Sequence, residues 1–223
     1  TLAFKPDQKT GIAFGLKPYS SVNYKFQQDQ AILDGNTSYT KYIDGNGGIN
    51  QVYFSVGRSL LKKLSVGITA SWLFGSLQRT TSYSSNSIDL AITKEDRDFY
   101  NAGLFQGGIQ YYTTGKKWKH QLGLTGSVST GLKGQLTTEY FDNGLSVQKN
   151  IENGRKFMLP LTTSLGYTAI YQDKITLSAA ANYYYWKYQP VDYIRSYTNP
   201  AFRLSAGVEI SFKNSNKWNN PAD

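Results

Sequence analysis

The fold is decided by the stretch Leu64-Ser65-Val66-Gly67-Ile68-Thr69-Ala70-Ser71-Trp72-Leu73-Phe74. Its even-numbered residues are all apolar, and small or polar residues stand at most of the positions between them. A period of two predicts a β-strand with two unlike faces. The stretch is longer than an ordinary strand, and at about 3.3 Å per residue it is long enough to cross a membrane at a tilt.

The same alternation recurs along the chain and predicts eight strands. The further segments are 11–24, 51–57, 99–112, 122–132, 157–167, 175–183 and 202–212. No segment of useful length has a helical pattern. The sequence therefore predicts an all-β protein, namely an antiparallel up-and-down transmembrane β-barrel or an eight-strand segment of a larger barrel.

The placement of charge separates a membrane barrel from a soluble one, which also alternates. The segments around Trp72, Phe105, Val128, Leu165 and Ala179 carry no charge, and charges gather between segments, at Lys62–Lys63, Lys94–Asp98, Lys116–Lys119 and Asp173–Lys174. A lipid-facing band with charged ends explains this partition. Aromatic residues near the segment ends fit an interfacial girdle. A soluble lipid-binding barrel is the less favoured alternative.

The connections between segments alternate in length. The short ones are Lys62–Lys63, Gly115–Lys117 and Asp173–Lys174. The long ones run through Asp34–Asn36 and Asp44–Gly48, from Ser76 to Asp98, from Lys133 to Arg155 and from Gln189 to Pro200. Outer-membrane barrels have short periplasmic turns and long external loops. We therefore expect the first strand to run outward, with both ends of the chain on the periplasmic side.

Composition limits the possible partners. Charged residues make up 17% of the chain, below the usual ~25%. The net charge is +9, but the basic residues are scattered over turns and do not form the stripe that nucleic acid requires. We expect outer-membrane lipids and lipopolysaccharide phosphates as the counter-charge, with ordinary solubility charge as the alternative.

The barrel is assigned to residues 1–213 and a polar turn or tail to 214–223, and the chain is expected to be a segment of a longer, exported protein.

The residues for catalysis or metal binding are sparse. The chain has no cysteine and one histidine, His120, which lies beside the Lys116–Lys119 turn and is expected at the periplasmic rim. No Gly-x-Ser-x-Gly motif surrounds a serine, and one histidine cannot form a zinc cluster. Asp44-Gly45-Asn46-Gly47 lacks the spacing of a calcium loop and is predicted to be a glycine-rich turn. We predict no enzymatic activity, cofactor or metal.

Several stretches resemble the FadL/TodX family of outer-membrane proteins, in its Bacteroidetes-type form. They are Gly11–Tyr24, Gly45–Phe54 with Leu64–Gly75, Leu159–Leu161, Tyr183–Trp186 and Arg203–Glu209. The resemblance implies a 14-stranded barrel with an N-terminal hatch, located in the outer membrane of a Gram-negative bacterium. It also implies passive uptake of hydrophobic small molecules such as long-chain fatty acids. The alternative is a structural or secretion-associated outer-membrane β-barrel protein without a transported ligand.

The alternation also supplies candidate residues for the barrel lumen. Three charged residues within strands, Lys17, Arg203 and Glu209, have the parity of the inner face, as a lipid-facing charge would cost about 2–4 kcal/mol near the midplane. Lys17 or Arg203 could hold a ligand carboxylate while its alkyl chain packs on Tyr19, Phe105 or Trp186. Alternatively, Arg203 and Glu209 belong to an ion-pair network that braces the barrel. Pro18 marks either a bulge or lateral gap, or a plain edge position.

Overall fold

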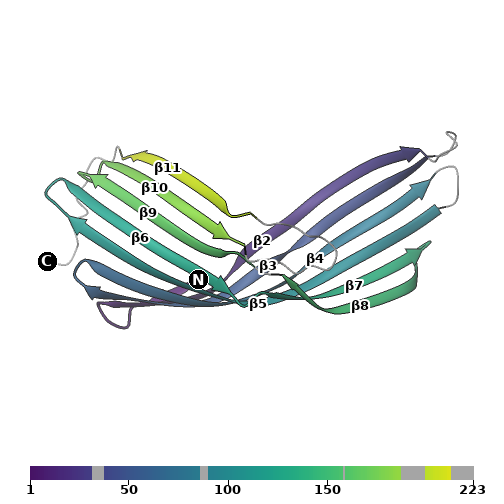
Figure 1. Ribbon diagram of the computed structural model, residues 1–223, viewed down its shortest axis with the longest axis horizontal. Coiled ribbons are helices and arrows are strands. Elements are labelled where there is room, and N and C mark those ends of the chain that lie inside the picture. The colour runs from purple at the N-terminus through teal and green to yellow at the C-terminus, as the bar shows by residue number, and fades with distance from the viewer. Residues whose placement is uncertain (32–37, 86–89, 158, 187–198, 212–223) are drawn as a thin grey trace, which may run out of the picture.

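The protein is built from a single antiparallel β-sheet (Figure 1). The computed structural model describes residues 1–31, 38–85, 90–157, 159–186 and 199–211. Among these residues, no helix is long and apolar enough to cross a membrane. Within these ranges all the strands belong to the one sheet.

The sheet has eleven strands. They are β1 (Leu2–Phe4), β2 (Thr10–Ala31), β3 (Ser38–Leu61), β4 (Leu64–Ser85), β5 (Leu90–Thr114), β6 (Trp118–Ser129), β7 (Leu132–Asp142), β8 (Leu145–Phe157), β9 (Leu161–Tyr171), β10 (Ile175–Tyr185) and β11 (Ala201–Ile210). The main path runs β1-β2-β3-β4-β5-β6-β9-β10-β11, and the β7–β8 hairpin pairs with β5 beside this path. Every pairing is antiparallel, and the sheet curls into a half-barrel, which confirms the predicted fold class.

Three strands lie outside the eight that the alternation predicts: β1, β7 and β8. The link from Lys133 to Arg155, expected as a loop, is instead the β7–β8 hairpin. Its turn is formed by Asn143 and Gly144, whose φ angles are 45° and 81°. Two successive positive φ angles are characteristic of a type I′ turn, which favours Asn-Gly and matches the twist of a hairpin.

The strands β2 to β5 are 22 to 25 residues long, so each extends over about 70–80 Å. The expected loops at Asp44–Gly48 and Ser76–Asp98 were wrong, because most of their residues continue these strands. Their backbone groups are paired across the sheet even though their side chains are polar. Backbone pairing makes a ladder without an apolar face, so the loss of alternating apolar residues did not end the strands.

One row of paired residues crosses the long strands where the sheet bends, and we call it the waist: Ser20, Ile49, Gly75, Tyr100 and Gly134. A bulge at Pro18–Ser20 lies beside the row in β2, as one interpretation of Pro18 predicted. A Cβ on Gly75 would stand 2.1 Å from the Gly48 carbonyl oxygen. Figure 1 shows the sheet bent into an open V, with β6 and β9–β11 in one arm and β7–β8 in the other.

The bend creates the largest apolar cluster among the described residues. Ile49, Leu73, Ala102, Leu104 and Leu132 are buried together, and Tyr100 and Leu159 pack against them. Leu73 has no exposed surface. A single curled sheet can bury a side chain this completely only where its own strands fold over it, so the cluster stabilises the bend.

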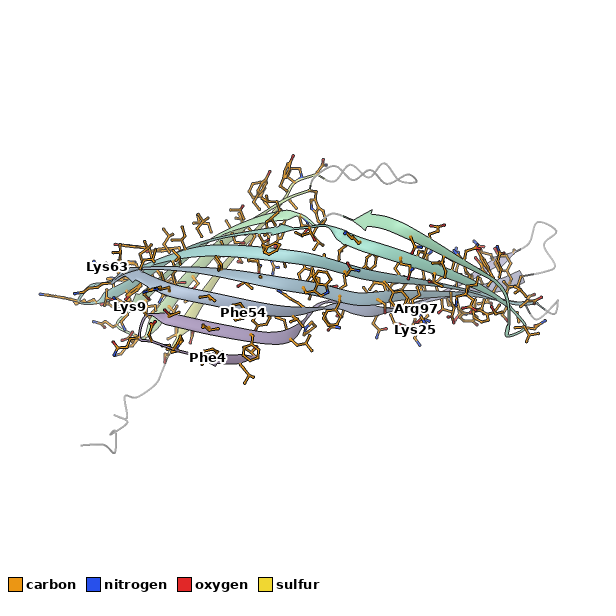
Figure 2. All side chains as sticks on the ribbon, turned by 90° about the horizontal axis from the view of Figure 1, so that it is seen from below. Phe4, Lys9, Lys25, Phe54, Lys63 and Arg97 are labelled. Atoms are coloured by element: carbon orange, nitrogen blue, oxygen red, sulfur yellow. The ribbon has the colours of Figure 1, made fainter. Side chains whose placement is uncertain are left out.

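The waist divides the sheet into two halves. The proximal half carries the turns at Lys62–Lys63, Gly115–Lys117 and Gln172–Asp173, and backbone hydrogen bonds join neighbouring turns: Tyr112 N–H to Lys63 O (2.9 Å) and Gln172 N–H to Lys117 O (2.8 Å). The distal half carries the Asn143–Gly144 turn. In Figure 2, Lys9 and Lys63 lie at one end of the sheet, and Lys25 and Arg97 lie toward the other.

The predicted gathering of the three short turns at one end is therefore confirmed. Some expectations lie outside the described residues: the connection at Asp34–Asn36, most of the link from Gln189 to Pro200, and the tail at 214–223.

The close approach at Gly75 gives a direct test of the waist. We expect Gly75→Ala to destabilise the fold by about 1–3 kcal/mol, because the new methyl group would overlap a backbone oxygen that cannot rotate away. Urea unfolding in detergent micelles, followed by tryptophan fluorescence, measures the change. Gly123→Ala is the matched control, since nothing lies within 4 Å of its Cβ position. Equal stability of the two variants would show that the waist is not tightly packed.

Candidate functional site

The two faces of the proximal half differ in kind. Residues paired across neighbouring strands share a face, so Trp72 lies with Val52, and Ala70 lies with Phe54 and Phe105. This face is exposed: Ile68 retains 70% of its accessible surface and Trp72 retains 55%. On the opposite face Ser71 retains 8%. The apolar face lies outside and the face with small and polar residues lies inside, the reverse of a soluble core.

We call the exposed apolar face of the proximal half the belt. It comprises Ile12, Phe14, Leu16, Val52, Phe54, Val56, Ile68, Ala70, Trp72, Phe74, Phe105, Ile109, Leu122, Leu124, Val128, Leu165, Tyr167 and Leu177. Most of its large side chains are exposed. The predicted outward orientation of Ile68, Trp72, Leu165 and Leu177 is confirmed.

The outer face becomes polar beyond the waist. On β4, Phe74 is followed on the same face by Ser76, Gln78, Thr80 and Ser82. The paired positions on β3 and β5 change in the same way, to Asn46, Asp44, Arg97 and Glu95. The waist is therefore both the bend of the sheet and the limit of its apolar outer surface.

An aromatic cluster lies at the proximal edge of the belt. The His120 ring is stacked between Trp118 and Tyr167, and its Nδ1 lies 2.8 Å from the Tyr167 hydroxyl. Trp118 also contacts Tyr171, with ring centroids 4.8 Å apart. The expected position of His120 at the rim is confirmed, and its neighbours are the aromatic residues typical of a membrane interface.

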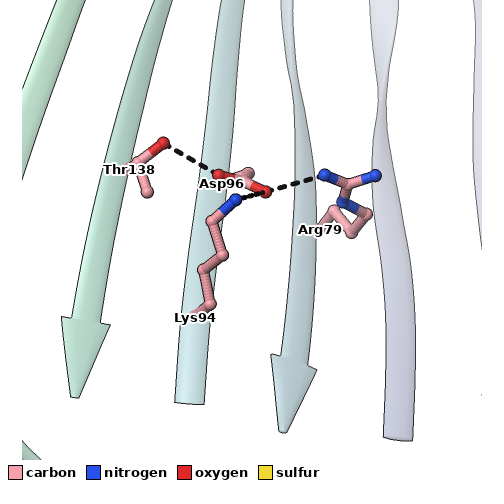
Figure 3. Close-up of polar contacts among 4 residues, drawn as sticks. All are labelled: Arg79, Lys94, Asp96 and Thr138. Carbon is pink, nitrogen blue, oxygen red and sulfur yellow. Dashed lines mark hydrogen bonds and ion pairs between the residues drawn. The ribbon is translucent and has the colours of Figure 1, made fainter.

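The distal half contains an ionic cluster around a buried carboxylate on its inner face. Arg79, Asp96 and Thr138 are paired in one row across β4, β5 and β7. The Asp96 carboxylate accepts hydrogen bonds from Arg79 Nη2 (2.9 Å) and Thr138 Oγ1 (2.8 Å), and Lys94 Nζ lies 3.0 Å away (Figure 3). Asp96 is 7% exposed. The cluster ties the β7–β8 hairpin to the long strands.

The surroundings of Asp96 have opposite effects on its pKa. Burial raises the pKa, whereas the hydrogen bonds from Arg79, Thr138 and Lys94 lower it, and the pKa of Asp96 ends below its usual value. The hydrogen bond to Asp96 in turn raises the pKa of the Arg79 guanidinium. Asp96 is therefore ionised at neutral pH, and its charge is balanced by two cations.

The sheet separates the lumen candidates of β2 and β5. Lys17 pairs with Gln51 on the inner face, where its Nζ lies 5.3 Å from the centre of the Tyr53 ring. Tyr19 occupies the bulge between Pro18 and Ser20. The expected lumen position of Phe105 was wrong: it pairs with Ala70 and Val128 and belongs to the belt. The weak alternation of segment 99–112 did not reveal which of its residues face inward.

The remaining candidates lie at the other edge. Trp186 follows the end of β10, and Arg203 and Glu209 lie on β11, paired with Asn182 and Thr176 on the inner face. Arg203 and Glu209 are six residues apart on β11, about 20 Å, so they do not pair with each other directly. Their place in an ion-pair network stays a prediction. The six candidates do not converge on one site. Their role in ligand binding stays a prediction.

The Asp96 cluster was missed because Lys94–Asp98 had been interpreted as a loop. The alternation within that run, with Lys94, Asp96 and Asp98 on one face and Glu95 and Arg97 on the other, is the signal that could have revealed it. Among the residues that the structure describes, no group of three His, Cys, Asp or Glu side chains could hold a metal ion.

The lowered pKa of Asp96 predicts a dependence on acid. A carboxyl group with a depressed folded-state pKa contributes stability above its unfolded value, near 3.8, and loses it as the pH falls through the folded value. We expect the protection of the β7 and β8 backbone amides against hydrogen exchange to fall below about pH 4. At neutral pH, Asp96→Asn should lower the local stability of β7 and β8 by about 1–3 kcal/mol. It should also remove the acid dependence of their protection. Glu139→Gln is the control, since its partner Lys149 is 3.9 Å away and exposed. Similar acid dependence in wild type and Asp96→Asn would contradict this role.

Comparison with known proteins gives one finding. No curated protein and no solved structure matches the chain. A family model does match, over residues 1–211, and its family is described as BamG.

This match overturns the expectations that rested on the FadL/TodX resemblance. The resemblance was wrong, and so were the predicted fatty-acid channel and the associated transport and lipid-binding roles. The expected partners, lipids and a hydrophobic ligand, were also wrong, because the family implies protein partners. The stretches that supported the resemblance are rich in glycine and aromatic residues, which recur in all barrels of this kind.

The expected compartment is confirmed at a coarser level: the family is associated with the outer membrane of Gram-negative bacteria. The match includes every strand from β1 to β11, and hence the belt, the waist and the Asp96 cluster. With nearly the whole chain matched, the protein belongs to the BamG family.

Proposed function

We propose that this protein is a structural subunit of the Bam complex, which assembles proteins into the outer membrane. The observation that carries the proposal is the family match over residues 1–211. The alternative raised from the sequence, a structural outer-membrane β-barrel protein without a transported ligand, agrees with this role.

We further propose that the half-barrel is integral to the membrane. The belt supports this, because a continuous exposed apolar surface of this extent is unusual on a soluble protein. On β4 the apolar residues with outward parity run from Leu64 to Phe74, a length that suits a tilted crossing of the bilayer. The aromatic cluster around His120 borders the belt at one end, and the polar outer face beyond the waist borders it at the other.

The distal half then stands outside the bilayer. Its outer face carries Lys25, Asp44, Arg97 and Glu139, which would be costly in hydrocarbon. The short turns of the proximal half face the periplasm if the protein follows the usual arrangement of outer-membrane barrels. A subunit of this shape presents protein surfaces on both sides of the membrane.

The subunit role is tested by loss of function. Depleting the protein should lower the amount of an unrelated outer-membrane barrel that reaches its heat-modifiable folded form, as measured on gels. An affinity-tagged copy should purify together with the Bam complex in mild detergent. Normal folding of other barrels after depletion, together with no co-purification, would reject the subunit role.

The integral placement makes a separate prediction. Ile68→Lys should cost about 2–4 kcal/mol of folding stability in a bilayer, because Ile68 lies near the middle of the belt. Thr80→Lys, on the same strand and face but beyond the waist, should change stability by less than about 0.5 kcal/mol. Urea unfolding in phospholipid vesicles measures both. Equal costs would place the belt outside the bilayer.

A further inference from the structure

The positive charge of the protein is concentrated at its proximal end. We call this end the rim; it consists of the segment Lys5–Lys9, Arg58 and the turns at Lys62–Lys63, Gly115–Lys119 and Gln172–Lys174. Backbone hydrogen bonds connect these parts, among them Ser59 N–H to Lys9 O (2.9 Å). The rim carries nine cations (Lys5, Lys9, Arg58, Lys62, Lys63, Lys116, Lys117, Lys119 and Lys174) and two carboxylates (Asp7 and Asp173). It therefore accounts for most of the net charge of +9.

The distal half differs, because its charges are of both signs and several of them are paired. Within the described ranges, ion pairs join Lys25 to Asp44, Arg79 and Lys94 to Asp96, and Lys149 to Glu139. At the rim the structure shows a single pair, Lys119 with Asp173 at 2.6 Å. The Asp7 carboxylate accepts the backbone N–H groups of Lys9 and Thr10, both at 2.7 Å. The rim is thus a region of uncompensated positive charge.

Part of this charge borders a cavity on the inner side of the sheet. The cavity has a volume of about 550 Å³, and its lining includes Lys5, Lys9 and Arg58. Gly11, Gly57, Gly67 and Gly108 form one row of its floor across four strands. Nothing lies within 4 Å of the Cβ position of Gly11, and the nearest atom to that of Gly67 is 3.5 Å away. A Thr125 methyl carbon stands 3.0 Å from the Cβ position of Gly108, so the open part of the row runs from Gly11 to Gly67. There another backbone can approach closely.

We infer that this cavity and the rim around it dock an acidic, extended segment of a partner protein. The carboxylates of the segment pair with Lys5 and Lys9, its backbone lies over the glycine row, and the other rim cations, Arg58 among them, attract it from a distance. A protein fits better than a lipid surface, since the cavity lies on the face opposite the belt. The inference rests on the proposed function, which supplies a protein partner for the rim.

Binding of an oligoglutamate peptide to the full chain in nonionic detergent, measured by fluorescence anisotropy, tests the docking. The peptide should bind, and binding should weaken when the salt concentration rises from ~0.05 M to ~0.5 M. Changing Lys5, Lys9 and Arg58 together to Gln should weaken it about tenfold, or about 1.4 kcal/mol. The matched control changes three distal cations, Lys25, Lys41 and Lys149, to Gln and should leave binding unchanged. Equal weakening by both triple variants, or no binding by the wild type, would overturn the inference.

Two further measurements separate the alternatives. The first uses phosphatidylglycerol vesicles as a competitor of the peptide, together with a variant in which Lys62, Lys63, Lys116 and Lys117 are changed to Gln. The inference fails, and the rim is a membrane surface, if the vesicles displace the peptide, this variant no longer binds vesicles, and the cavity variant still binds the peptide as strongly as the wild type. Co-purification with the Bam complex tests the proposed function separately. If the wild type and the cavity variant co-purify with the complex equally well, only the docking site is rejected. Thermal unfolding of each variant confirms that its fold is intact.

Discussion

The structure depends on one constraint: every strand must pair its backbone, while only part of its length has an apolar outer face. Between the proximal turns and the waist, the ladder combines with alternating side chains to give the belt. Beyond the waist the ladder continues with polar residues on its outer face, and stability there depends on contacts such as those of Asp96. Hydrogen bonding thus extends the sheet well past the surface that the hydrophobic effect can stabilise.

The all-β class, the inside-out arrangement and the clustering of short turns could be predicted from the sequence, because they follow from the period of two, the uncharged segments and the alternating lengths of the connections. The lengths of β2 to β5 could not, since Asp44–Gly48 and Lys94–Asp98 have the composition of loops. The β7–β8 hairpin was signalled by Asn143–Gly144, a dipeptide suited to a tight turn, but the charges around it suggested a loop. Phe105 was assigned to the wrong face because glycines interrupt the alternation around it.

The candidate site shows the same limit at the level of single residues. Parity correctly assigned Lys17, Arg203 and Glu209 to the inner face, but it contains no information on distances across the sheet, and these residues lie on strands near opposite edges. The Asp96 cluster depends on register between β4, β5 and β7, which local patterns do not specify. The family was also out of reach of short motifs, because glycine and aromatic residues serve the same physical purpose in all outer-membrane barrels.

The strands cross the waist in two different ways, which has a mechanical consequence. β2 to β5 each continue through it as one strand, with a bulge in β2 at Pro18–Ser20, whereas the neighbouring path has a break between β6 and β7 and another between β8 and β9. Together, β2 to β5 form a continuous four-stranded sheet that connects the two ends of the molecule. The β7–β8 hairpin is linked to β6 and β9 only through the chain itself, and it is held to the long strands by its pairing with β5. Besides these two covalent connections, the hairpin is held by the backbone pairing of β7 with β5 and by the hydrogen bond from Thr138 to Asp96, so its orientation relative to the long strands depends on that pairing.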